Sequence, residues 1–159
     1  MRKQKGFSLI ELLIVVAIIL IIAAIAIPNL MRSRIAANEA SAVGSVRTIN
    51  TAEVTYASAY PDIGFTNTLA NLAGSSCSGV TSATSTGACL IDNVLGSGTK
   101  SGYTFQISGV TGTPGVTYSQ TASPVTVGSS GQRGFYSDQT GVIRYNQSGA
   151  ATSADNPLQ

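Results

Sequence analysis

The apolar residues of this 159-residue chain are concentrated in one run near its N-terminus. Residues 7–27 are apolar except for Ser8 and Glu11. As an α-helix they would extend about 31 Å at a rise of 1.5 Å per residue, which is enough to cross a bilayer. Basic residues flank the run: Arg2, Lys3 and Lys5 before it, Arg32 and Arg34 after it. The positive-inside tendency predicts a cytoplasmic N-terminus and a long C-terminal part across the membrane.

A different pattern follows the apolar run. Apolar residues recur every seven positions, at Ile35, Ala42, Ile49 and Tyr56. This spacing predicts an amphipathic helix over residues 30–60, whose apolar stripe packs on a sheet. We expect most of its charged side chains to face away from the sheet: Arg32, Arg34, Glu39, Arg47 and Glu53. Pro61 predicts the end of the helix near Tyr60, and Pro28 predicts a kink or local opening.

The remaining residues predict a globular head, 61–159. Residues 62–102 are rich in Ser, Thr and Gly and predict a long irregular connecting loop. Four segments with strand composition are separated by Gly, Pro and Ser turns: 102–109, 115–122, 133–138 and 141–146. Aromatic residues in these strands should fill the core. Residues 147–159 have little that could pack. The predicted fold is therefore α+β, a long helix on a four-stranded antiparallel sheet (103–146).

The chain has two cysteines, Cys77 and Cys89, in the Ser/Thr-rich connector. Because they follow a membrane-type segment, we expect an oxidising compartment and a disulfide between them. Closing such a loop would stabilise the fold by roughly 3 kcal/mol in the chain-entropy description. The alternative is a pair of buried free thiols.

Charge and composition exclude several classes of function. Three of the nine Lys/Arg residues precede Gly6, which leaves six against seven Asp/Glu residues in the rest of the chain. A duplex-binding domain would show clustered basic residues, and none is present. The chain has no histidine, so a metal site or a His-dependent catalytic arrangement lacks its parts. We expect a non-enzyme with no cofactor, no metal and no specific nucleic-acid site.

The segment "KGFSLIELLIVVAIILIIAAIAIPNL" (5–30) resembles the N-terminus of type IV pilins and pseudopilins. It combines a basic leader, Gly6, the aromatic Phe7 and Glu11 before the apolar run. The resemblance implies that a membrane peptidase cuts between Gly6 and Phe7 and methylates the new amine of Phe7. It also implies a leader (1–6), a transmembrane and filament-core helix (7–29), the amphipathic half of the helix (30–60), and the pilin fold.

Two simpler interpretations of the apolar run stay open, a plain membrane anchor and a signal peptide with an A-x-A cleavage pattern at 24–26. Neither explains Glu11, because a charged residue inside a membrane helix is costly. In a filament the carboxylate can face the N-terminal amine of a neighbouring copy, where a pair is tolerable and a lone charge is not. We therefore expect Glu11 to set the register between subunits, as a buried polar residue does in a coiled coil.

The resemblance implies a structural subunit of a bacterial type IV pilus, a homopolymer built through helix packing. The subunit would wait in the inner membrane and end in an extracellular filament that supports adhesion, twitching motility or DNA uptake. Its partners would be the prepilin peptidase and the pilus assembly machinery. Two alternatives remain: a pseudopilin of a type II secretion system, which usually carries an acidic calcium-binding loop not found here, and a membrane-anchored periplasmic binding domain.

Overall fold

The computed structural model describes residues 6–74, 77 and 83–158. The basic leader residues Arg2, Lys3 and Lys5 lie outside this range. The chain divides into two compact units, residues 1–34 and residues 35–159. The second unit contains the predicted head (61–159) together with the residues before it, and the word head denotes this whole unit, residues 35–159.

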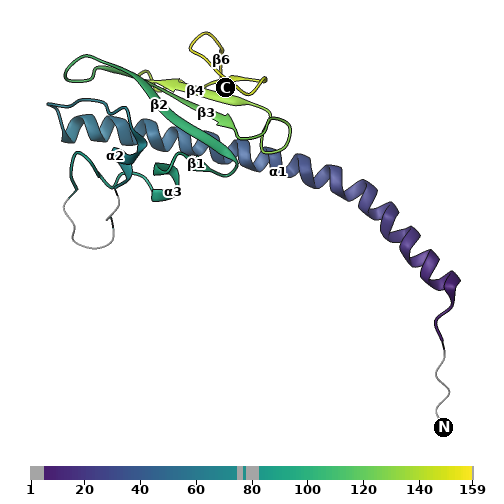
Figure 1. The fold of residues 1–159 in the computed structure, drawn as a ribbon. Helices are drawn as coiled ribbons and strands as arrows, with labels where there is room; N and C mark the ends of the chain where they lie inside the picture. The colour runs from purple at the N-terminus through teal and green to yellow at the C-terminus, as the bar shows by residue number, and fades with distance from the viewer. Residues whose placement is uncertain (1–5, 75–76, 78–82, 159) are drawn as a thin grey trace. The chain divides into compact units, whose positions relative to one another are not determined.

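The first unit consists of the N-terminal part of helix α1 (Leu9–Ala59) (Figure 1). Its large apolar side chains are exposed from Phe7 to Leu30, with Phe7 itself 78% exposed. Among the described residues, α1 is the one helix long and apolar enough to cross a membrane. Pro28 lies inside α1, and the helix continues through it. The kink expected at this residue stays a prediction.

The head contains a six-stranded antiparallel sheet in which the strands follow one another in chain order. The strands are β1 (Thr99–Lys100), β2 (Tyr103–Thr111), β3 (Thr117–Pro124), β4 (Gly134–Asp138), β5 (Arg144–Asn146) and β6 (Asn156–Pro157). The α+β fold is confirmed, with two more strands than predicted. β1 and β6 have two residues each, and two residues are too few to show the alternation that marks a strand.

The connector and the tail differ from their predictions. Within residues 62–102, which were expected to be irregular, two short helices form, α2 (Leu69–Ala73) and α3 (Asn93–Gly96). The tail also packs, because β6 pairs with β5, the amide of Leu158 donates to Ile143 O at 2.7 Å, and Ala151 is buried. The apolar residues of both segments therefore extend the core of the head.

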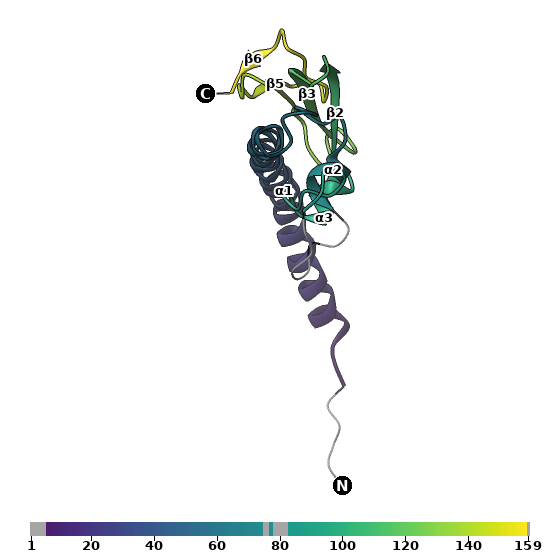
Figure 2. The same ribbon diagram turned by 90° about the vertical axis from the view of Figure 1, so that its left-hand side faces the viewer.

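The core lies between the sheet and the part of α1 that belongs to the head. The predicted stripe is confirmed at Ala42, Ile49 and Tyr56, each at most 1% exposed. The strands contribute Tyr103, Phe105, Tyr118 and Phe135, whereas Tyr136 and Tyr145 are half-buried. Figure 2 shows α2 and α3 beside α1, on the same side of the sheet and below β2.

Two of the charged residues expected to face away from the sheet are buried instead. Glu39 is 6% exposed and Glu53 is fully buried. Both belong to the stripe 39, 42, 46, 49, 53 and 56, whose steps alternate between three and four residues, so they lie on the core face of α1. The prediction was wrong because it judged these positions by their charge and not by their spacing.

Candidate functional site

The junction between the predicted leader and the helix is exposed to solvent in the structure. Gly6 and Phe7 precede the first turn of α1, and both are exposed. A Cβ placed on Gly6 would meet no other atom within 4 Å. Because both residues precede α1, the Gly6–Phe7 bond lies outside the helix.

Glu11 has a local partner that the sequence analysis did not foresee. The backbone amide of Ser8 donates to Oε2 of Glu11 at 2.8 Å, and the amide of Leu12 donates to the carbonyl of Ser8 at 3.3 Å. This is one half of a capping box, in which the acidic residue at the third helical position reaches back to the residue before the helix. The sequence signal was the S-x-x-E spacing of Ser8 and Glu11.

This cap gives Glu11 a role within one chain. A carboxylate in the first turn is favoured by the partial positive charge of the helix N-terminus, and it satisfies an amide that has no helical acceptor. The chain is uncut in this structure, so the nitrogen of Phe7 is a peptide nitrogen and stands in for the amine that cleavage would release. Glu11 therefore lies in the turn where that positive charge would appear.

In the head, Glu39 fastens α1 to the segment that leads into β4. Its Oε1 accepts from the amides of Gln132 and Arg133 at 2.9 and 3.0 Å. Its Oε2 accepts from Nε of Arg133 at 2.7 Å, which makes a salt bridge. The guanidinium of Arg133 also lies 5.7 and 5.6 Å from the ring centres of Phe135 and Tyr145.

The protonation state of Glu39 follows from these contacts. Burial acts to raise the pKa of this carboxyl, but the two backbone amides and the Arg133 guanidinium outweigh burial and lower it below the ordinary 4.5. Glu39 is therefore ionised near neutral pH. A charged carboxylate with two amide donors and one guanidinium donor is a strong link between α1 and the sheet.

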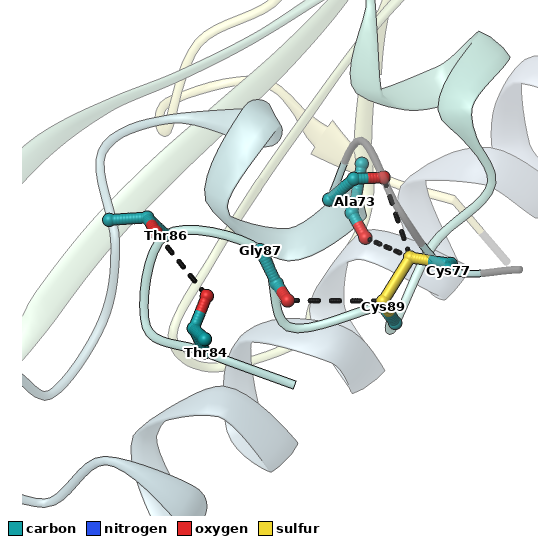
Figure 3. The surroundings of a disulfide bond; sticks show 7 residues. Ala73, Cys77, Thr84, Thr86, Gly87 and Cys89 are labelled. Atoms are coloured by element: carbon teal, nitrogen blue, oxygen red, sulfur yellow. Dashed lines mark hydrogen bonds between the residues drawn. A yellow bond between two sulfur atoms is a disulfide. The ribbon is translucent and has the colours of Figure 1, made fainter. Parts of the chain in front are cut away.

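Cys77 and Cys89 form a disulfide in the structure (Figure 3). Cys77 follows α2 by four residues, and Cys89 comes after the tight turn at 84–87, where Thr84 and Gly87 exchange backbone hydrogen bonds of 3.0 and 3.1 Å. The amides of Ala88 and Leu90 donate to the carbonyls of Asn71 and Leu72, each at 2.7 Å. The disulfide therefore joins two segments that are already held together at α2.

Comparisons with known proteins match part of the chain. A family profile described as "Prokaryotic N-terminal methylation motif" matches residues 1–27. The chain is 64% identical over 39 residues to the "Type IV wide pilus major component PilA4" of Thermus thermophilus, which covers 24% of this chain and 30% of that protein. It is 43% identical over 54 residues to the "Type IV major pilin protein PilA" of Myxococcus xanthus, which covers 34% of this chain and 24% of that protein.

These matches leave most of the head uncovered. The chain spans less than a third of the length of either relative. No solved structure matches the chain significantly. The family profile matches the segment that contains Gly6, Phe7 and Glu11.

Proposed function

We propose that this chain, whose N-terminal segment is that of a type IV pilin, is a structural subunit of a bacterial type IV pilus. One observation carries the proposal: residues 7–27, whose large apolar side chains are exposed, contain a single charged residue, Glu11, and follow directly after Gly6. An isolated membrane anchor would use Glu11 only as a helix cap. A subunit that polymerises through its helix also offers the carboxylate a positive partner on a neighbouring copy.

The subunit begins in the inner membrane as a single-pass protein with its leader in the cytoplasm. The prepilin peptidase removes residues 1–6 and methylates Phe7, as the match to the methylation motif over residues 1–27 supports. The assembly machinery then transfers the apolar helix from lipid into an extracellular filament. The head, with its disulfide, lies outside the cytoplasm, where disulfides persist.

Within the filament, the apolar half of α1 packs against the same segment of other copies. Lipid is as apolar as a helix surface, so association depends on close packing more than on water exclusion. Small residues allow two helix backbones to approach closely, and this half of α1 contains four of them: Ala17, Ala23, Ala24 and Ala26.

Glu11 adds specificity to this packing. The methylated amine of Phe7 in a neighbouring copy neutralises the carboxylate, and a helix at the wrong axial offset leaves both charges unpaired in an apolar surround. The cap from Ser8 holds the Glu11 side chain at the helix start until the partner arrives. The register is therefore set by electrostatics and the cohesion by packing.

Both relatives are named as pilus components, which supports a structural role for this chain over a catalytic one. The same names favour a surface pilus over the pseudopilus of a type II secretion system. A membrane-anchored binding domain would retain an intact N-terminus or one cut by signal peptidase, and it would form no polymer. The state of the N-terminus therefore separates the two classes.

The test is mass spectrometry of protein sheared from the surface of cells that express this chain. We expect the mature protein to begin at Phe7 with one methyl group on its amine, and to be recovered in high-molecular-mass fibres. A chain that begins at Met1, or near Ile27 after signal-peptidase cleavage, would contradict the proposal. The matched control is Gly6→Leu, which should leave the protein uncut and absent from the sheared fraction.

A further inference from the structure

The carboxyl group of Glu53 is buried in the head and forms no salt bridge with the residues that the structure describes. Glu53 lies on the core face of α1 and is fully buried. Its Oε2 accepts a hydrogen bond of 3.1 Å from the backbone amide of Thr66. Its Oε1 has no partner among the residues that the structure describes. A buried ionised carboxylate with a single donor is costly.

The side-chain donors that β3 directs at the preceding turns of α1 are already engaged by other acceptors. Nε2 of Gln120 on β3 donates to the carbonyl of Val46 at 3.0 Å and to Oδ1 of Asn50, one turn before Glu53. The hydroxyl of Tyr118 donates to the same Oδ1 at 2.8 Å. The second buried polar side-chain atom left without a partner in the described part of the chain is also an acceptor, Oε1 of Gln120. Such surroundings suit a neutral carboxylic acid, which brings a donor of its own.

Glu53 is held against segment 61–68, the stretch that connects α1 to α2. This segment is irregular and mostly exposed, but Gly64 and Thr66 are buried. Besides the bond from Thr66 to Glu53, it pairs with the β2–β3 connection through Phe65 N to Gly115 O at 3.0 Å and Gly115 N to Ile63 O at 2.7 Å. Nδ2 of Asn71 also donates to Oγ1 of Thr66 at 2.8 Å. The segment belongs to no helix and to no strand of the sheet, so among the elements around Glu53 it is the one whose opening breaks no helix or sheet ladder.

We infer that Glu53 is a proton-controlled latch: its neutral form keeps segment 61–68 closed on the head, and its ionisation favours opening of that segment to water. The inference concerns the head alone and does not depend on the function proposed above. Displacing Thr66 would give the carboxylate the water that the closed head denies it.

The surrounding charges allow this behaviour. The titratable groups whose pKa the charge of Glu53 affects are Tyr56 on its own helix and Tyr118 on β3. Burial raises the pKa of both phenols, so they stay neutral and cannot neutralise the carboxylate. Burial likewise raises the pKa of Glu53 to about 7, although the Thr66 amide acts to lower it. No Lys or Arg side chain within the described ranges forms a salt bridge with Glu53.

The direction of the pH effect follows from linkage. In the open state the carboxyl is solvated and has its ordinary pKa of 4.5, against about 7 when closed. Because the pKa of Glu53 is higher in the closed state than in the open state, the closed state is most stable below pH 4.5. It loses stability as the pH rises from 4.5 to about 7. Between about pH 5 and about pH 8 the opening equilibrium should increase roughly 50-fold.

Amide hydrogen exchange of the full chain in detergent micelles tests the inference. The protection factor of the Thr66 amide, which corrects for the intrinsic pH dependence of exchange, should fall roughly 50-fold from about pH 5 to about pH 8. Amides of the β3–β4 ladder, such as that of Thr121, should change little. In Glu53→Gln, which keeps an acceptor for Thr66 and cannot ionise, the fall should disappear. Asp62→Asn removes an exposed acid from the same segment and should leave it intact.

Two results would overturn the latch: a Thr66 protection factor that stays constant in the wild-type protein, or a fall that persists in Glu53→Gln. A second measurement needs no variant. The carboxyl carbon of Glu53, followed by NMR, should titrate with a midpoint near 7. A midpoint below about 5 would show that the closed head tolerates the charge, and the latch would be wrong.

Discussion

Filaments should be almost lost when Glu11 is replaced by alanine, while the amount of the protein in the membrane stays the same. The apolar run remains long enough to insert, and removing a charge makes insertion easier. Assembly suffers because the amine of Phe7 in the neighbouring copy has no counter-ion in an apolar surround. We expect at least a tenfold fall in sheared filament protein relative to membrane protein, since 1.4 kcal/mol of lost pairing already corresponds to about tenfold. Immunoblots of the two fractions measure the ratio.

Because Glu11 also caps α1, a second variant must separate the cap from the charge. Glu11→Gln retains an oxygen that can accept from the amide of Ser8 but has no charge to offer a neighbouring amine. If the register depends on charge, Glu11→Gln should assemble as poorly as Glu11→Ala. Normal filament yield from Glu11→Gln, together with a loss in Glu11→Ala, would assign the residue to the cap and contradict the electrostatic explanation.

Replacing Glu39 with alanine should destabilise the head by about 3 kcal/mol. The change leaves the amides of Gln132 and Arg133 without their acceptor and removes the salt bridge to Arg133. Chemical denaturation of the full chain in micelles, followed by near-ultraviolet circular dichroism of the tyrosines, measures the loss. Glu39→Gln keeps one acceptor and should lose less. Arg47→Ala, an exposed position on the same helix, should stay within about 0.5 kcal/mol of the wild type.

The pH dependence of this link is opposite to that of Glu53. The pKa of Glu39 is lowered in the folded head, so its contribution is present above the unfolded value of 4.5 and is lost as pH falls through the folded value. The difference in stability between wild type and Glu39→Ala should therefore be constant near neutral pH and shrink in acid. A difference that persists unchanged in strong acid would mean that the carboxylate charge contributes nothing.

The part of the chain that sequence predicts best is the part with a strict pattern. The apolar run, the seven-residue repeat through Ala42, Ile49 and Tyr56, and the helix end next to Pro61 each follow from local physical rules. The last two predicted strands are found as β4 and β5, joined by a turn in which Gly141 N donates to Asp138 O at 2.9 Å. In these places the local signal and the tertiary packing agree.

The features that sequence missed depend on partners far away in the chain. Glu39 is buried because a guanidinium and two amides more than ninety residues later reach it. Glu53 is buried under segment 61–68. Gln120 is a polar residue at an inward position of β3, where alternate residues are buried. Each lies at a position whose spacing marks the core, but its polar side chain argues against burial, and only the fold shows which atoms satisfy it.

The cysteine pair is an intermediate case. Composition and the preceding apolar run predicted an oxidising compartment, and hence the pair Cys77 and Cys89. Nothing in the spacing indicated that the bridge would lie beside α2, because α2 has only five residues and lies in a segment whose composition predicts an irregular loop. Short elements of this kind form through tertiary contacts, and local propensity alone does not reveal them.

The central claim is that copies of this chain polymerise through the apolar half of α1, with Glu11 paired across subunits. Electron cryo-microscopy of filaments sheared from expressing cells tests it most directly. The account predicts a filament core built from packed copies of the segment that starts at Phe7, with each Glu11 carboxylate within hydrogen-bond distance of the Phe7 amine of a neighbouring copy. A polymer in which Glu11 faces water, or has no positive group beside it, would contradict the account.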